Sequence, residues 1–154
     1  MAKKSKFELA VIQKVIKAGV SVQNQMIGSI GQGIVVFLAI SNTDSLDEVK
    51  KISNKIINLR IFPNTKNKMD HSLQDIKGEI LLISQFTLYG DCSHGNRPSF
   101  IKAGSSKHAK KIYNEFVNYI KSTKVNVAQG KFGAMMQVSL TNDGPVTLIL
   151  NSDD

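Results

Sequence analysis

The sequence predicts a single α+β domain over residues 1–154, in which two main amphipathic helices accompany a curved, mostly antiparallel, barrel-like sheet. The length is close to the commonest domain size, and no linker, internal repeat or low-complexity tract divides the chain. Strand-like patterns occupy the first and last parts of the chain, whereas apolar residues recur every three or four positions in two segments between them. This order differs from the regular βα alternation of a doubly wound parallel sheet.

The first elements predicted are strands. Residues 1–6 form a short basic tail that we expect to be frayed, and residues 7–16 are rich in β-branched side chains. A second strand is expected through residues 20–22. Residues 23–25 then read as a tight turn into residues 26–27, which predicts an early hairpin.

A buried strand and a helix follow. Residues 34–40 are apolar on both faces, which is typical of a central, fully buried strand. Ser45 and Glu48 have the spacing of a capping box and therefore predict the start of a helix. The apolar stripe of this helix consists of Leu46, Val49, Ile52, Ile56 and Leu59. Residues 68–73 are again strand-like.

In the second half of the chain, another buried strand and another amphipathic helix are followed by closing strands. Residues 79–83 predict another buried strand, and residues 90–98 a surface loop. The stripe of the second amphipathic helix consists of Ala109, Ile112, Tyr113, Phe116, Val117 and Ile120. Two closing strands are expected at residues 132–140 and 146–150, joined through residues 142–147.

Composition limits the classes of function. The net charge of +8 is compatible with a nucleic-acid partner, but also with a solvated, lysine-rich surface. The lone Cys92 excludes an internal disulfide and suits a reducing, cytoplasmic location. His71, His94 and His108 lack the spacing of zinc ligands, so we expect no metal and no cofactor. No apolar run approaches the roughly 20 residues needed to cross a bilayer, so no membrane association is expected.

Two short motifs are the candidate functional sites. Residues 84–88 read Ser-Gln-Phe-Thr-Leu at the end of a predicted strand, and residues 142–147 read Asn-Asp-Gly-Pro-Val-Thr between two others. Both place backbone amides and carbonyls where a ligand could reach them. Neither contains a histidine or a cysteine, and the first contains no carboxylate, so catalysis here would rest largely on main-chain groups.

Thr87 is the candidate nucleophile of the first motif. A threonine hydroxyl needs a base to activate it, and no His or Lys lies nearby in the sequence. Because β-branched threonine is common in strands, a purely structural role is the alternative. Gly144-Pro145 would likewise be interpreted as a turn, with a trans peptide bond as the default.

These two motifs resemble the signatures of the D-aminoacyl-tRNA deacylase family, Ser-Gln-x-Thr-Leu and Asn-x-Gly-Pro-Val-Thr. The similarity extends to residues 11–15, 59–62, 97–100 and 130–134, and hence to nearly the whole chain. The resemblance implies hydrolysis of the ester that joins a D-amino acid to the 3′-terminal ribose of tRNA, with glycyl-tRNA as an additional candidate substrate. It further implies a homodimer with two sites at the interface and no metal.

The resemblance also implies residue roles. Gly144 and Pro145 would form a cis peptide that reaches into the partner's site and rejects L-substrates by steric clash. Ser84, Gln85, Phe86 and Thr87 would line the opposite side of the pocket, where the backbone N–H groups of Phe86 and Thr87 would hold the scissile carbonyl. We favour attack by water, assisted by the 2′-hydroxyl of the substrate ribose, over direct attack by Thr87.

The resemblance assigns two apolar side chains to the substrate as well. Phe132 and Met136 would pack against the terminal adenosine, with membership of the core as the alternative. The chain departs from the family pattern at Lys14, where the family usually has Arg, and Lys cannot make the same bidentate contacts. It also has Ala18-Gly19 in place of the usual Ala-Ser pair, which we interpret as a change of turn chemistry.

Two other functions remain open at this level. One is a related enzyme with a trans Gly-Pro peptide that corrects L-alanine or glycine mischarging; a cis bond at Gly144–Pro145 would argue against it. The other is a tRNA- or DNA-binding module that has lost catalysis, which the net charge of +8 permits. Binding without turnover would support the second.

Overall fold

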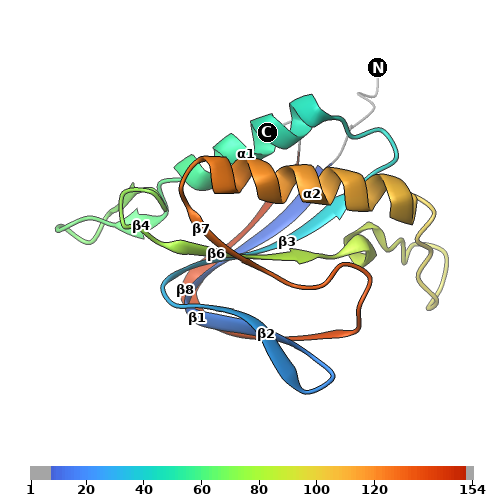
Figure 1. Ribbon diagram of the computed structural model, residues 1–154, viewed down its shortest axis with the longest axis horizontal. Helices are drawn as coiled ribbons and strands as arrows, with labels where there is room; N and C mark the ends of the chain where they lie inside the picture. The colour runs from blue at the N-terminus through green and yellow to red at the C-terminus, as the bar shows by residue number, and fades with distance from the viewer. Residues whose placement is uncertain (1–7, 152–154) are drawn as a thin grey trace.

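The computed structural model describes residues 8–151, and these form a curved, barrel-like mixed sheet with two helices across one face (Figure 1). The elements in order are β1 (Glu8–Val22), β2 (Gln25–Ile30), β3 (Gly33–Ile40), α1 (Leu46–Asn58), β4 (Phe62–Pro63), β5 (Met69–His71), β6 (Glu79–Ser84), the 3₁₀ helix η1 (Phe86–Tyr89), α2 (Ser106–Ser122), β7 (Asn126–Gln129) and β8 (Met136–Asn151). The fold class is α+β, as predicted. The tail predicted at residues 1–6 lies outside the described residues.

Among the described residues the main sheet is mixed, with three antiparallel and two parallel pairings. The main path runs β2-β1-β3-β6-β7, and β8 pairs with the other edge of β1. All pairings of β1 are antiparallel, but β3 with β6 and β6 with β7 are parallel. Parallel neighbours need a crossover connection, and α1 and α2 supply the two crossovers. The antiparallel majority agrees with the prediction, whereas the two parallel pairings were not predicted, because sequence periodicity does not show the direction in which a buried strand is paired.

The sheet curves until its two edges come close together. The position that a Cβ would take on Gly28 in β2 lies 3.1 Å from the carbonyl oxygen of Gln129 in β7. The hairpin before this point is as predicted. Gln23 and Asn24 have φ angles of 50° and 63°, the left-handed pair that a tight hairpin turn requires.

The predicted strand boundaries need three corrections. β1 is one continuous strand of 15 residues, whereas the sequence suggested two. β7 was not predicted. The two expected closing strands are a single strand, β8, and residues 130–135 before it are loop, although buried and exposed positions alternate there as in a strand. Residues 142–147 therefore lie inside β8 instead of in a turn between two strands.

The core has two parts, one on each face of the sheet. A large cluster lies between the sheet and the two helices, and a smaller one, which includes Val35 and Ile83, lies on the opposite face. The predictions of buried strands at β3 and β6 are confirmed, because both strands contribute side chains to both clusters.

Both helices pack against the larger cluster. The capping box of α1 is confirmed: the Glu48 carboxylate accepts a 2.6 Å hydrogen bond from the backbone N–H of Ser45. All six residues of the predicted α2 stripe are buried. In α1, however, Leu46 is 47% exposed, so the predicted stripe begins one turn too early. No helix within the described residues is long and apolar enough to cross a membrane.

Candidate active site

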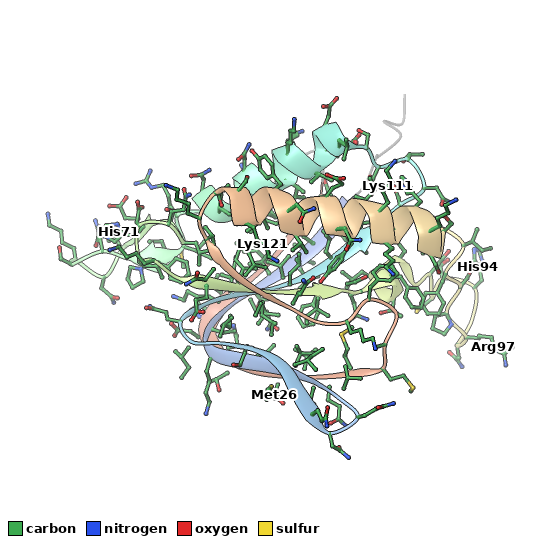
Figure 2. All side chains as sticks on the ribbon, in the orientation of Figure 1. Met26, His71, His94, Arg97, Lys111 and Lys121 are labelled. Atoms are coloured by element: carbon green, nitrogen blue, oxygen red, sulfur yellow. The ribbon has the colours of Figure 1, made fainter. Side chains whose placement is uncertain are left out.

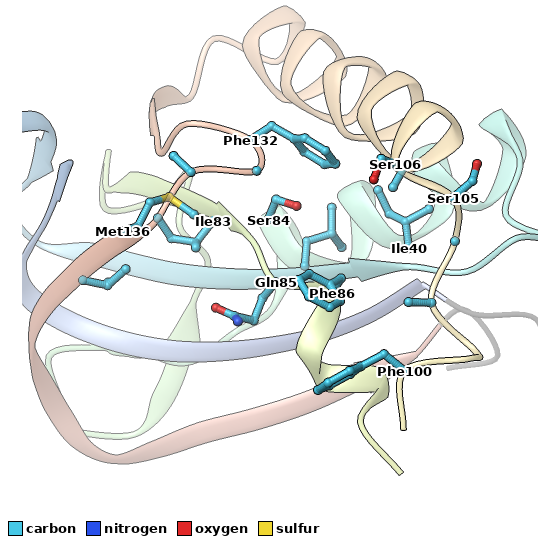
Figure 3. A pocket seen from close by; sticks show the side chains of 17 residues that line it. Ile40, Ile83, Ser84, Gln85, Phe86, Phe100, Ser105, Ser106, Phe132 and Met136 are labelled. Atoms are coloured by element: carbon cyan, nitrogen blue, oxygen red, sulfur yellow. The ribbon is translucent and has the colours of Figure 1, made fainter. Parts of the chain in front are cut away.

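A pocket of about 630 Å³ opens where the ends of β3 and β6 meet the start of α2 (Figure 3). Its wall is completed by η1, residues 103–106 and the loop before β8. The polar side chains in the lining are Ser84, Gln85, Ser105 and Ser106. Within residues 8–151, no Asp, Glu, His, Lys, Arg, Cys or Tyr contributes to it. A reaction in this pocket would therefore lack an ionisable side chain in contact with the substrate.

The end of β6 positions the first motif. Ser84 is the last residue of β6 and pairs with Leu38 of β3. The backbone N–H of Gln85 extends this ladder through a 2.8 Å hydrogen bond to the Leu38 carbonyl oxygen. The chain then turns into η1, whose first hydrogen bond runs from the Leu88 N–H to the Gln85 carbonyl. Within residues 8–151, no acceptor is paired with the backbone N–H groups of Phe86 and Thr87.

Thr87 lies at the rim of the pocket and not in its lining. Its side chain is exposed, and its Oγ1 is 2.5 Å from the Gln85 Nε2, which donates to it. The hydroxyl of Ser84, in contrast, belongs to the lining and points into the pocket in Figure 3. Neither hydroxyl has a hydrogen bond to a histidine or a carboxylate among the described residues. Among the described residues, neither hydroxyl therefore has a histidine or carboxylate beside it that could act as a general base and activate it as a nucleophile.

Phe132 and Met136 lie on the side of the pocket nearest to α2 and β8 (Figure 3). Phe132 packs against the large core cluster, and its ring centroid is 5.8 Å from that of Tyr113. The Tyr113 hydroxyl donates a 3.1 Å hydrogen bond to the Leu82 carbonyl, and burial raises the pKa of this tyrosine. Phe132 thus contributes to the core with one face and to the pocket with another.

The wall beside α2 was not predicted from the sequence. The backbone N–H of Gly104 donates to the Ile40 carbonyl at 2.9 Å, and that of Ser105 to Oδ1 of Asn42 at 3.0 Å. Ser105 then caps α2 by accepting a 3.3 Å hydrogen bond from the His108 N–H. The sequence offered one weak signal for this wall: Ser105 is a residue type that often caps the start of a helix.

Asp44 stabilises the loop behind this wall. It is 3% exposed, and its Oδ2 accepts a 2.7 Å hydrogen bond from the Ser41 N–H, while its buried Oδ1 has no hydrogen-bond partner among the described residues. Burial raises the pKa of the Asp44 carboxyl to about 6. This side chain lies outside the pocket lining and contacts the chain just after β3 through Ser41.

The second motif forms a bulge in the middle of β8. Gln13 of β1 pairs with Thr147, and Val15 pairs with Asn142, so the four residues 143–146 face Lys14 alone. Asn142 closes the base of the bulge, because its Nδ2 donates to the carbonyl oxygens of Lys14 at 2.9 Å and Val146 at 3.1 Å.

Gly144 and Pro145 form the exposed part of this bulge. The peptide bond between them is cis, the isomer that the resemblance implies. Neither residue lines the pocket. The buried Lys14 lies beneath them, with its Nζ 3.6 Å from Oδ2 of Asp143 and 5.9 Å from the Phe62 ring centroid. Within one chain, the two motifs are therefore separate.

Comparison with known proteins identifies the family. The model of the D-Tyr-tRNA(Tyr) deacylase family matches residues 11–151. The chain belongs to this family. It is 51% identical to a D-aminoacyl-tRNA deacylase of Clostridium botulinum (strain Alaska E43) and 50% identical to one of Clostridium acetobutylicum, in each case over 93% of this chain and 96% of the relative. The resemblance inferred from the two motifs is thus confirmed.

Solved structures show the same fold. A structure described as c-Myc DNA Unwinding Element Binding Protein has a TM-score of 0.86 and 41% identity, covering 92% of this chain and 97% of that chain. A probable eukaryotic D-amino acid tRNA deacylase has a TM-score of 0.84 at 16% identity, covering 94% of this chain and 99% of that chain. The second likeness concerns the fold alone.

Proposed function

We propose that this chain is a D-aminoacyl-tRNA deacylase, which hydrolyses the ester between a D-amino acid and the 3′-terminal ribose of tRNA. Membership of the deacylase family and the names of its relatives support this activity. The observation that carries the mechanism is a pocket whose lining, in the part of the chain that the structure describes, has no ionisable side chain. It lies beside the backbone N–H groups of Phe86 and Thr87, which no acceptor in that same part of the chain pairs. Such a site suits a reaction in which backbone N–H groups, rather than acid or base side chains, stabilise the transition state.

In this mechanism the ester carbonyl oxygen accepts hydrogen bonds from the Phe86 and Thr87 N–H groups. The negative charge that develops on this oxygen during attack is then stabilised by donors that need no reorganisation, and one such donor is typically worth roughly 2.7–4 kcal/mol. Water attacks the carbonyl carbon, and the 2′-hydroxyl of the ribose assists it. The bond to the 3′-oxygen breaks, that oxygen takes a proton, and free D-amino acid and tRNA are released.

The lining residues provide binding and orientation. Phe132 and Met136 hold the terminal adenosine, and Ser84 and Gln85 border the aminoacyl group. The Gln85 amide, which donates to Thr87, keeps the Thr87 side chain directed away from the carbonyl. The transition state thus depends on backbone geometry and on the RNA. No metal or cofactor enters the proposal.

We further propose that the active form is a homodimer in which Gly144 and Pro145 of each copy enter the pocket of the other. This role is supported by their exposure, by their absence from the described lining of their own pocket, and by the hydrogen bonds of Asn142 that close the bulge. Carbonyl groups held there would clash with the side chain of an L-amino acid. Glycine has no side chain to clash, so glycyl-tRNA is a second expected substrate. The expected location is the cytoplasm, where tRNA is charged.

A nucleic-acid-binding function without catalysis is the second candidate. It is favoured by the net charge of +8 and by the 41% identity to a protein described as a DNA unwinding element binding protein. Hydrolysis of matched D-tyrosyl- and L-tyrosyl-tRNA by the purified protein distinguishes the two. Rapid loss of the D-ester with the L-ester spared supports the deacylase, and binding of tRNA without loss of either ester refutes it.

A further inference from the structure

Two aromatic side chains at the rim of the pocket have no role in the mechanism above. Phe86 is 56% exposed and Phe100 is 38% exposed, and both belong to the lining. Their rings meet edge to face, with centroids 5.4 Å apart and planes 70° apart. In Figure 3 this pair lies across the pocket from Phe132. Exposed aromatic faces beside a polar site are the usual platform on which nucleic-acid bases stack.

The position of Phe100 is fixed by its backbone. Asp91 and Ser99 form a short antiparallel bridge with hydrogen bonds of 2.7 and 2.9 Å, and the Phe100 carbonyl accepts from the Ala103 N–H at 3.1 Å. The ring lies close over Gly90, because a Cβ on that glycine would be 3.0 Å from Cε1 of Phe100. The ring is therefore held in place before any ligand binds.

The charge around this pair suits a phosphate backbone. Asp91 is the one acidic residue between Phe86 and Ser105, and its carboxylate already accepts hydrogen bonds from the Ser93 N–H and hydroxyl. The same segment carries Arg97 and Lys102. Figure 2 shows Arg97 on the loop at this end of the molecule, with His94 nearby. An RNA strand leaving the pocket here would meet positive charge.

We propose that Phe86 and Phe100 form a stacking subsite for the penultimate base of the single-stranded 3′ end of tRNA. This inference rests on the proposed function, which places the terminal adenosine against Phe132 and the ester at the N–H groups of Phe86 and Thr87. The next nucleotide must then leave the pocket over its rim, where the aromatic pair is exposed. Stacking tolerates any base, which suits an enzyme that acts on many tRNAs with the same CCA end.

The first test uses a single-stranded RNA ending in CCA, with 2-aminopurine in place of the penultimate base, because its fluorescence falls on stacking. The full-length protein is expected to quench this signal. Phe100→Leu, which keeps apolar volume but loses the ring face, is expected to weaken binding about five- to tenfold. Ile101→Ala is the matched control, since Ile101 is 87% exposed and lies outside the pocket lining. Phe100→Tyr keeps the ring and is expected to quench like the unmodified protein.

The second test measures single-turnover hydrolysis of a D-tyrosyl minihelix with either a normal or an abasic penultimate nucleotide. Removing the base is expected to slow the unmodified protein about five- to tenfold at subsaturating protein, and to slow Phe100→Leu much less. An equal loss in both proteins, or no quenching by the unmodified protein, would overturn the subsite. So would a changed oligomeric state of Phe100→Leu with unaltered quenching, which would assign the pair to a contact between copies.

The two proposals fail in different ways. If the unmodified protein hydrolyses no D-ester, the proposed function is wrong, and the fluorescence measurement still decides whether the aromatic pair stacks a base. If hydrolysis proceeds but the abasic nucleotide has no effect, only the subsite is wrong. The abasic comparison in the unmodified protein needs no variant, so a folding defect in Phe100→Leu leaves the test intact.

Discussion

Replacement of Thr87 by valine tests whether the protein or the RNA supplies the chemistry of this site. Valine keeps the branched shape of threonine and removes only the hydroxyl. That hydroxyl accepts one hydrogen bond, from Nε2 of Gln85 at 2.5 Å, and the side chain is exposed. One such bond is worth about 0.5–1.5 kcal/mol, and water can replace it here. Even if the whole of this energy were lost in the transition state, the rate of D-ester hydrolysis would fall only about tenfold.

A nucleophilic Thr87 would give a very different result. Loss of an attacking hydroxyl typically removes several orders of magnitude in kcat. The assay is single-turnover hydrolysis of D-tyrosyl-tRNA, with Ser84→Ala as a control because the Ser84 hydroxyl lies in the pocket lining. Mass spectrometry of the quenched enzyme looks for an acyl adduct. A loss of more than about a thousandfold in Thr87→Val, or an adduct on Thr87, would refute the backbone mechanism.

Three further predictions follow from the same geometry. Asn142→Ala removes both hydrogen bonds that close the β8 bulge, so the ratio of L- to D-tyrosyl-tRNA hydrolysis should rise about tenfold while the D-rate changes less. Because the pocket lining formed by residues 8–151 has no ionisable side chain, the single-turnover rate between about pH 6.5 and 8.5 should rise smoothly, and a bell-shaped profile would contradict this. Burial raises the pKa of Asp44 from 3.8 to about 6, so the folded protein binds this proton more tightly than the unfolded chain does. The resulting contribution to the free energy of unfolding is complete below about pH 4 and is lost as the pH rises through about 6. Asp44→Asn should therefore remove the fall in unfolding free energy between about pH 4 and 6. At pH 7.5, urea unfolding should show a variant that is more stable by up to about 3 kcal/mol. If the pH dependence of the unfolding free energy is unchanged, Asp44 is not the titrating group.

The sequence predicted the elements whose signals are local. The buried strands β3 and β6 are continuous apolar runs, and the α2 stripe repeats at the helical period, so neither depends on what packs against it. The continuity of β1 was missed because Gly19 suggests an interruption. In the structure this glycine stays in the strand and makes room for a neighbour, since a Cβ there would lie 2.9 Å from Sδ of Met26. That contact is between strands and leaves no trace in the local pattern.

The candidate site was predictable on one side only. The first motif follows an apolar strand, so its exposure at the strand end could be inferred from position. Ser105, Ser106 and Phe100 reach the same pocket through contacts between distant segments, such as the bridge from Ser41 to Ala103. No spacing rule connects these residues. The aromatic pair of Phe86 and Phe100 is likewise separated by a loop whose path only the structure gives.

The second motif was expected in a turn, and its place inside β8 changes the physical argument for selectivity. A turn at the end of two strands could move as a unit, whereas residues 143–146 are held between two paired segments of β8 and braced by Asn142. A steric filter needs this rigidity, because a loop that yields would admit the L-side chain at little cost. Since Gly144 and Pro145 do not line their own pocket, the proposed filter would act on the pocket of a second copy. Chiral selectivity in the proposed enzyme would then depend on assembly, while the N–H groups of Phe86 and Thr87 belong to each chain alone.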